Sequence, residues 1–368
     1  MKLLDLKLKN FRNYQSLKIS FSPKMNLIIG TNGVGKTNLI EAIYVLAITK
    51  SFKSNYDEVL VKNNEKSAKI EGNIEERLTN NYVIELDSNG KKAKINKTNI
   101  PKLSDYISRI QVILFSSNDL KLIKDSPSVR RKLLNVEISQ INNNYLKYLN
   151  EYNKIIKQRN AYLKILYTNK TASRDYLHIL NDKVILYGTK IMEQRQKFIE
   201  QINRYLKTIY NSISNIDSLI LKYHSDYWNI TEEEIRKKYE KLEEKDIILG
   251  KTSFGVHMDD IEFTLDNYNL KDYGSEGQQK NAIIAFKLSE LKLYKEEYHS
   301  LPILIIDDLY SELDKYKINS ILENLDPDIQ TFITVTDLNK VKKSIRNESK
   351  IIKIKDGVIE YEKWILWW

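Results

Sequence analysis

Hydrophobic and polar residues alternate along the start of the chain in a pattern that predicts strands. Leu4, Leu6 and Leu8 alternate with charged residues, and a similar alternation returns at 17–21. We therefore expect a hairpin within residues 3–29, ending in the apolar strand 27–29. A glycine-rich turn over residues 30–37 follows. After it, apolar residues recur at helical spacing, which predicts a helix with one apolar face formed by Leu39, Ile40, Ile43, Leu46 and Ala47.

The pattern changes twice further along the chain. Alternation over residues 66–96, around an Asn89-Gly90 turn, predicts an added antiparallel sheet, and residues 111–115 predict another strand. From residue 127 to about 245, apolar residues recur every three or four positions, which predicts a helical insertion too short for a long coiled-coil arm. Strands and helices alternate again from residue 255: strands at 261–265, 303–306 and 331–335, helices after 277 and around 318–325, and a hairpin turning at 356–357.

The glycine-rich turn matches the phosphate-loop pattern G-x-x-x-x-G-K-[ST] at every fixed position. Its glycines let backbone N–H groups point at phosphate oxygens, and the following helix adds a partial positive charge. Lys36 would reach the β and γ phosphates, and Thr37 would offer its hydroxyl to Mg²⁺. We expect nucleotide binding by Gly30, Asn32, Gly33, Gly35, Lys36, Thr37 and Asn38.

Two acids follow the apolar strand 303–306. Parallel-sheet nucleoside triphosphatases place a Mg²⁺ ligand and a water-polarising group at the end of such a strand. We assign Asp307 to the metal, with Thr37, and Asp308 to the attacking water, so that Lys36 and Asp308 are the catalytic candidates. The following Ser311-Glu-Leu-Asp314 resembles the D-loop of ABC-type ATPases.

The segment Tyr273-Gly-Ser-Glu-Gly-Gln-Gln-Lys280 opens the helix before that strand and looks like an ABC signature. There, Ser275, Gly277 and Gln278 would contact ATP held by a second copy of the chain. The predicted fold is therefore α/β: an ABC-ATPase head with a mixed sheet, flanking helices, an antiparallel β lobe and an inserted helical lid. We expect lobes at 1–125 and 251–368, separated by the lid at 126–250.

Charge and composition narrow the class of protein. Residues 1–53 hold nine Lys/Arg against two Asp/Glu, and residues 121–170 hold eleven against three, although the whole chain carries only +10. This segregation favours a polyanion-binding face, with a solvated lysine-rich surface as the alternative. The absence of cysteine fits a reducing cytoplasm, and no apolar run reaches the roughly 18 residues of a membrane span. We expect no signal peptide and no membrane partner.

Several blocks resemble the RecF family in its order along the chain. They are Asn10-Phe-Arg-Asn-Tyr14, Lys36 to Ile43, Lys50-Ser-Phe-Lys53, Asp119-Leu120 with Ser126 to Arg131, Gly255 to Asp260, the Ser275 signature, and Asp307 to Asp314. The resemblance implies a protein that dimerises on ATP, binds DNA at single-strand gaps and adjoining duplex, and hydrolyses ATP slowly. It also implies action with RecO and RecR in loading RecA, in the cytoplasm at the nucleoid. Lys50, Lys53, Arg130 and Arg131 are the DNA-binding candidates.

The chain departs from the family pattern at several places. Lys50, Lys53 and Lys280 stand where arginines are usual, so phosphate contacts there lose the planar guanidinium fork. Phe115-Ser-Ser-Asn118 replaces the usual residues before Asp119, and Val256 stands where the family has proline. Asp337 occupies the place of a switch histidine. We assign no metal to His257, Asp259 and Asp260, and no role to the tryptophans at 364, 367 and 368.

The alternative function is that of an ABC-type ATPase subunit in another machine. A transporter subunit would carry a Leu-Ser-Gly-Gly-Gln signature, a glutamate after the metal-binding aspartate and a switch histidine, none of which occurs here. A long-armed chromosome-organising ATPase needs hundreds of heptad residues between its phosphate loop and signature. An ABC-like nuclease would require a further acid cluster, which the sequence does not offer.

Overall fold

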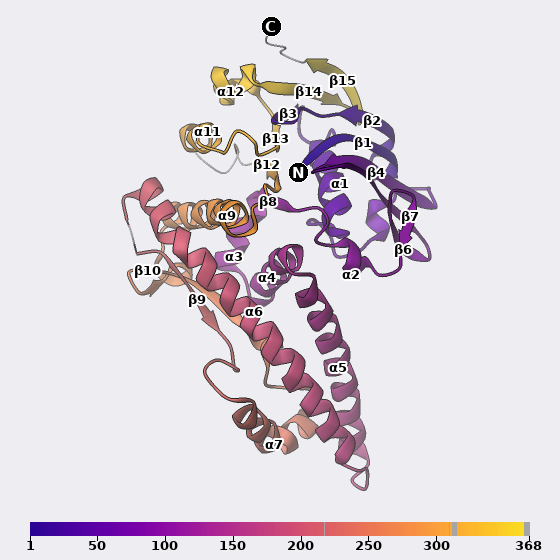
Figure 1. Ribbon diagram of the computed structural model, residues 1–368, viewed down its shortest axis with the longest axis vertical. Helices are drawn as coiled ribbons and strands as arrows, with labels where there is room; N and C mark the ends of the chain where they lie inside the picture. Colours follow the sequence, from indigo (N-terminus) through magenta and orange to yellow (C-terminus); the bar gives the residue numbers. More distant parts are fainter. Residues whose placement is uncertain (217, 309, 311–314, 364–368) are drawn as a thin grey trace. The chain divides into compact units, whose positions relative to one another are not determined.

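The computed structural model describes residues 1–216, 218–308, 310 and 315–363, and the chain divides into two compact units (Figure 1). The first joins residues 1–119 to the C-terminal residues from Glu290 onward, and the second comprises residues 120–289. The sequence prediction places residues 251–289 in the C-terminal lobe of the ATPase head. They group instead with the helical segment, because strand β10 (Asp260–Leu265) pairs antiparallel with β9 (Ile220–His224) inside that segment.

The first unit contains a mixed core sheet. Strands β14, β3, β13, β12 and β8 run parallel, and the edge strand β15 is antiparallel to β14. Their order across the sheet is β15 (Val358–Lys363), β14 (Ser349–Lys355), β3 (Met25–Ile29), β13 (Thr331–Val335), β12 (Ile303–Asp307) and β8 (Val112–Ser116). The strands predicted at 27–29, 303–306 and 331–335 and the C-terminal hairpin are confirmed.

A second, antiparallel sheet lies beside the first. It begins with the predicted N-terminal hairpin and continues with the predicted strands of residues 66–96. Its order is β2 (Tyr14–Ser20), β1 (Lys2–Phe11), β4 (Ser67–Glu75), β5 (Thr79–Asp87), β6 (Gly90–Ile95) and β7 (Thr98–Ile100). Smaller elements of the chain are α2 (Leu103–Tyr106), α11 (Lys315–Glu323), α12 (Lys343–Asn347) and the 3₁₀ turns Glu58–Leu60, Ser117–Leu120, Val256–Met258 and Leu338–Lys340.

Helix α1 (Lys36–Ile48) packs between the two sheets, contacting β1, β4 and β5 on one side and β8, β12 and β13 on the other. Every residue from Leu39 to Ile48 is therefore buried, including Glu41 and Tyr44. The prediction of a single apolar face was too narrow, because a helix covered on both sides has no solvent face. This packing fixes the start of α1 against the ends of the core strands.

The second unit is mainly helical. It contains α3 (Lys121–Lys124), α4 (Pro127–Ile141), α5 (Asn143–Thr168), α6 (Asp175–Ser214), α7 (Glu232–Leu249), α8 (Leu270–Tyr273) and the start of α9 (Glu276–Tyr298), together with a small sheet ordered β11 (Tyr268–Asn269), β10, β9. Strand β9 corrects the expectation of a wholly helical insertion. Its signal is short: Leu219 and Leu221 are buried, while Ile220 between them is exposed.

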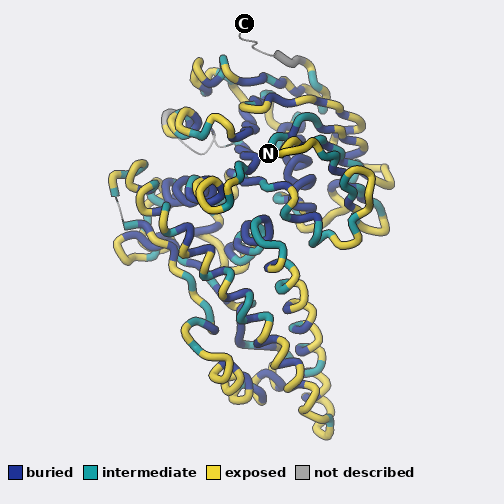
Figure 2. The backbone as a smooth tube through the Cα atoms, in the orientation of Figure 1, coloured by how far each residue is buried: buried dark blue, intermediate teal, exposed yellow. Residues whose placement is uncertain are grey.

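Helix α6 is the longest described helix of the unit, with 40 residues. Its buried residues recur at helical spacing and pack chiefly on α5, and its turns alternate between buried and exposed in Figure 2. At Gly188 the helix meets Tyr227, and an added Cβ would lie 2.6 Å from the Tyr227 ring. Among the described residues, no helix is both long enough and apolar enough to cross a membrane.

Candidate nucleotide site

The turn between β3 and α1 has the backbone that a phosphate loop requires. Gly33 and Gly35 take φ values of +85° and +114°, which side chains other than glycine rarely adopt. At Gly35 an added Cβ would also lie 2.6 Å from Asn13 Nδ2 and 2.9 Å from the Tyr14 hydroxyl. Conformation therefore favours glycine at both positions, and at Gly35 the close approach of the N-terminal hairpin requires it as well.

Lys36 is held inside the curl of this loop. Its ammonium donates hydrogen bonds to the carbonyl oxygens of Gly30, at 2.7 Å, and Thr31, at 2.8 Å. Burial lowers the pKa of Lys36, while the nearby Asp308 and Asp307 oppose that shift. The cation is thus positioned where a phosphate would replace part of its lost hydration.

Asp307 ends strand β12 directly beside the start of α1. Its Oδ1 accepts hydrogen bonds from the Thr37 hydroxyl, at 3.1 Å, and the Thr334 hydroxyl, at 2.8 Å. Burial raises the pKa of Asp307, and the two hydroxyls partly offset this. The structure therefore brings the two predicted metal ligands together.

This donor set suits Mg²⁺ bound together with a nucleotide. Mg²⁺ is usually held by one or two carboxylates and by substrate phosphates, with waters completing its shell. Among the described residues, no group of three or more His, Asp or Glu side chains forms a metal cage. Thr37 and Asp307 would therefore hold the ion only alongside phosphate oxygens, and the ion would neutralise phosphate charge.

Asp308 follows Asp307 in a left-handed backbone conformation, with φ of +53°. Its N–H donates to the Thr334 hydroxyl at 2.9 Å, which fixes the turn out of the strand. As a result Asp308 lines the same pocket as Lys36 and Thr37. That pocket has a volume of about 290 Å³ and is lined by Asn32, Gly33, Gly35, Lys36, Thr37, Asn38, Lys53, Asp308 and Thr334.

Sequence reasoning missed the groups that brace this loop from outside. The Tyr14 hydroxyl donates to Gly35 O at 2.9 Å, and Gly357 N donates to Val34 O at 3.1 Å. Asn13 accepts a hydrogen bond from Asn38 Nδ2 at 2.9 Å. Asn13 and Tyr14 lie in a block that the sequence analysis names. Their partners are 21 or more positions away along the chain, so the sequence pattern could not predict these contacts.

The signature segment opens α9 in the second unit. Ser275 and Gln278 cap the helix reciprocally: Gln278 N donates to Ser275 Oγ at 3.3 Å, and Ser275 N donates to Gln278 Oε1 at 2.8 Å. Ser275 and Gly277 are exposed, and an added Cβ at Gly277 would meet only Ser275 Oγ, at 4.0 Å. The helix start is therefore open to an approaching anion.

Lys280 and Asp337, which differ from the family pattern, each contact a residue close to them in sequence. Lys280 pairs with Glu276 at 2.7 Å, and the Asp337 carboxylate accepts a hydrogen bond from Asn339 N at 2.9 Å. The D-loop-like residues 311–314 and the tryptophans at 364, 367 and 368 lie outside the described residues.

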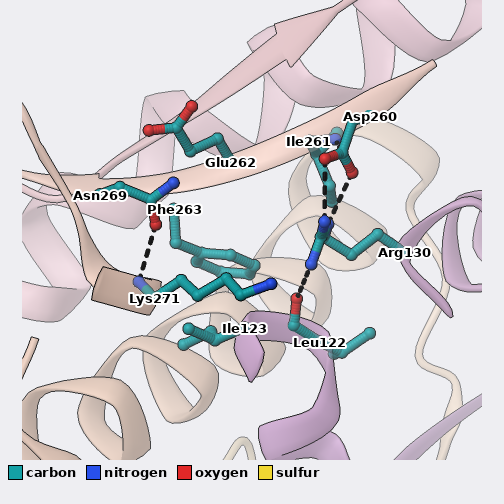
Figure 3. A pocket seen from close by; sticks show the side chains of 9 residues that line it. All are labelled: Leu122, Ile123, Arg130, Asp260, Ile261, Glu262, Phe263, Asn269 and Lys271. Carbon is teal, nitrogen blue, oxygen red and sulfur yellow. Dashed lines mark hydrogen bonds and ion pairs between the residues drawn. The ribbon is translucent and has the colours of Figure 1, made fainter. Parts of the chain in front are cut away.

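The structure corrects one DNA-binding candidate. Arg130 is only 6% exposed, and its guanidinium makes a bidentate contact with Asp260, at 2.6 and 2.8 Å (Figure 3). It also donates to the carbonyl oxygens of Leu122 and Asp125. Because it is buried, its charge is neutralised and four of its five donors are used, Arg130 ties α3 and α4 to β10 and is not available to DNA phosphates.

The other three DNA-binding candidates differ in their exposure and in their contacts. Lys50 is exposed on the loop after α1. Arg131 is half-buried and donates to Asp259 O at 2.7 Å, and burial lowers its pKa. Lys53 lines the nucleotide pocket, and its ammonium donates to Asn38 Oδ1 at 3.2 Å.

The phosphate loop follows the parallel strand β3, and the twin aspartates end β12, which is separated from β3 by β13. Together with the open signature helix, they define an α/β ATPase head of the ABC and SMC type. The solved Smc head domain of Pyrococcus furiosus shares this fold, with a TM-score of 0.53 at 17% identity over 97% of this chain and 95% of that one. At that identity the likeness supports the fold alone.

Closer comparisons identify the family. The family model described as RecF/RecN/SMC N terminal domain matches residues 2–360. The protein named DNA replication and repair protein RecF from Ligilactobacillus salivarius is 37% identical over 98% of both chains, and that from Bacillus velezensis is 36% identical over 98% of this chain and 100% of its own. The solved recombination mediator protein RecF with ATP, from the RecFOR pathway, matches with a TM-score of 0.91 at 30% identity, over 98% of this chain and 97% of that one. The chain belongs to the RecF family.

Proposed function

We propose that this chain is an ATP-dependent DNA-binding protein of replication and recombinational repair, and that ATP closes two copies of it on DNA. The observation that carries the proposal is the convergence of Lys36, Thr37 and Asp308 on one pocket, with Asp307 hydrogen-bonded to Thr37 at its edge. The names of the curated relatives, and the solved relative with ATP, support the same function.

In the proposed cycle the phosphate loop and Lys36 hold the triphosphate, and Thr37 and Asp307 hold Mg²⁺. Ser275, Gly277 and Gln278 of a second copy complete the site from outside, because a helix N-terminus with exposed N–H groups attracts phosphate. Asp308 orients water for attack on the γ-phosphate, and slow hydrolysis reopens the dimer. A carboxylate one methylene shorter than glutamate reaches less far, which supports slow turnover.

DNA would bind through cationic side chains without base-specific contacts. Since Arg130 is excluded by its contacts with Asp260, the candidate phosphate contacts are Lys50, Lys53 and the partly exposed Arg131. Single-strand gaps and adjoining duplex are the proposed targets, and proteins of the RecO and RecR type are the proposed partners in RecA loading. This assignment is supported by the solved relative of the RecFOR pathway. The proposed location is the cytoplasm, at the nucleoid.

The test uses two substitutions in the pocket, each measured for ATP binding, ATP-dependent dimerisation, hydrolysis and binding to gapped DNA. Lys36→Met removes the loop cation, so ATP affinity should fall about 100-fold and the dimer and its DNA binding should be lost. Asp308→Asn keeps the size of the side chain, so ATP, dimer and DNA binding should persist while hydrolysis slows by about 100-fold or more.

The two variants control for each other because they separate binding from turnover. A Lys36→Met protein that still dimerises with ATP would refute the site. Normal hydrolysis by Asp308→Asn would place the water-orienting group elsewhere.

A further inference from the structure

Ser51 lies in the loop after α1 and is only 4% exposed. Its hydroxyl oxygen accepts hydrogen bonds from the N–H groups of Lys53 and Ser54, both at 2.9 Å. Such a side-chain cap stabilises a tight turn. The backbone of Lys53 is therefore fixed by Ser51.

Glu41 in turn fixes Ser51. The hydroxyl of Ser51 donates to Glu41 Oε1, and Glu41 is completely buried within α1. A buried carboxylate is costly unless it is paired, and here Arg12 supplies a bidentate contact, at 2.8 and 2.6 Å. Arg12 also donates to Val59 O at 2.9 Å. One buried carboxylate thus joins the N-terminal hairpin and the Lys53 loop to the helix that carries Lys36 and Thr37.

The exposed end of this chain of contacts reaches the nucleotide pocket. Lys53 lines the pocket together with Lys36 and Asp308, and its ammonium hydrogen-bonds Asn38 Oδ1 at 3.2 Å. A lysine loses much conformational entropy when its ammonium is held in one place. Fixing its backbone beforehand reduces that loss, because fewer bonds remain free to rotate.

We propose that Ser51 and Glu41 are positioning residues that hold Lys53 at the nucleotide pocket, where its ammonium contacts the phosphates of a bound nucleoside triphosphate. This proposal rests on the proposed ATP function. It assigns Lys53 to the nucleotide and not to DNA, so it also changes one of the candidate DNA contacts.

A double-mutant cycle on the full chain tests the proposal, with affinity for MgATP measured by calorimetry. Lys53→Ala should weaken MgATP binding about tenfold, the loss expected for one charge-assisted contact. Ser51→Ala should weaken it about threefold, because the ammonium is still present but its loop is less ordered. In the Lys53→Ala background, Ser51→Ala should change nothing further, since no ammonium is left to position.

Ser54→Ala is the matched control, because Ser54 lies in the same turn and its hydroxyl hydrogen-bonds the backbone of Tyr56, where that of Ser51 bonds Glu41. Its MgATP affinity should equal that of the unaltered chain. If Ser51→Ala does not fold, Ser51→Cys keeps the size of the side chain with a poor hydrogen-bonding group. Additive effects of Ser51 and Lys53, or unchanged affinity in Lys53→Ala, would overturn the positioning role. If the unaltered chain itself bound no MgATP, the proposed function would fail instead.

Discussion

Asp307 is a carboxylate whose surroundings oppose its charge until a cation arrives. Burial raises its pKa above the ordinary 3.8, and two hydroxyl donors only partly offset that effect. An ionised Asp307 therefore destabilises the nucleotide-free protein at neutral pH. Mg²⁺ bound with ATP would remove this penalty, so the same residue couples stability to ligand binding.

Asp307→Asn should accordingly raise the melting temperature of the nucleotide-free protein at pH 7.5. Asparagine keeps the Oδ1 acceptor for Thr37 and Thr334 but carries no buried charge. The sign follows from the raised pKa: the penalty is present above the folded pKa and disappears as pH falls through it, so the gain should vanish near the ordinary value of 3.8.

Thermal unfolding at pH 7.5 and near pH 3.8, with and without MgATP, checks this prediction. The stabilisation that MgATP gives to the unaltered chain should be lost in the variant. A melting temperature lowered at pH 7.5 would show that the carboxylate stabilises the free protein.

At the scale of elements, local sequence signals were sufficient where a single segment carries the chemistry. The strand, glycine-rich turn and helix over residues 25–48 follow from alternation, turn residues and helical spacing, and so does the position of Asp307 and Asp308 after an apolar strand. These features were predictable because neighbours in sequence determine them.

Features that depend on distant partners were not predictable. Arg130 reads as a surface cation until Asp260, 130 positions away, is known to neutralise it. Likewise, Lys53 belongs to a basic block, and only the fold shows that it lines the same pocket as Lys36. The sequence pattern did not reveal strand β9, because its five residues give only a short alternation of buried and exposed positions between the long helices α6 and α7.

His257 joins two elements of the second unit and predicts a pH dependence. Its Nε2 lies 3.1 Å from the carbonyl oxygen of Thr252, which can only accept, so Nε2 carries the proton and Nδ1 accepts from the Tyr152 hydroxyl at 2.8 Å. Burial lowers the pKa of His257 below 6.5 and Arg131 lowers it further, while the hydrogen bond to Thr252 and the charges of Asp259 and Asp226 partly oppose this.

The unfolded chain therefore binds a proton at His257 more readily than the folded one. The free energy of unfolding of this unit should fall as pH drops through about 6.5, and His257→Gln should flatten that dependence. Hydrogen exchange of the α5 and α6 amides at pH 7.5 and 5.5 measures it. His224→Gln is the control, since the His224 side chain is 54% exposed and pairs with Glu262 on neighbouring β10. Equal protection at both pH values in the unaltered chain would contradict the prediction.

At the scale of the whole molecule, the proposed ATP site is shared between two copies, so mixing two inactive variants should restore activity. Lys36→Met disables the phosphate loop, and Gly277→Asp places a carboxylate at the open signature helix, where an added Cβ meets only Ser275 Oγ at 4.0 Å and folding should be unaffected. Each variant alone has no intact pair of phosphate loop and signature. In a mixed dimer, one of the two sites combines an intact phosphate loop with an intact signature.

Because neither variant can pair an intact phosphate loop with an intact signature in its own homodimer, ATP should favour the mixed dimer. Each mixed dimer holds one intact site of two, so at most about half of the unaltered ATPase activity should return. The control mixes Lys36→Met with a chain carrying both substitutions, which forms no intact site and should stay inactive. Steady-state phosphate release at saturating ATP is the measurement. If the first mixture also stays inactive while its two variants form mixed dimers, each chain must hydrolyse ATP within its own site, and Ser275 and Gly277 would have no role in the partner's site.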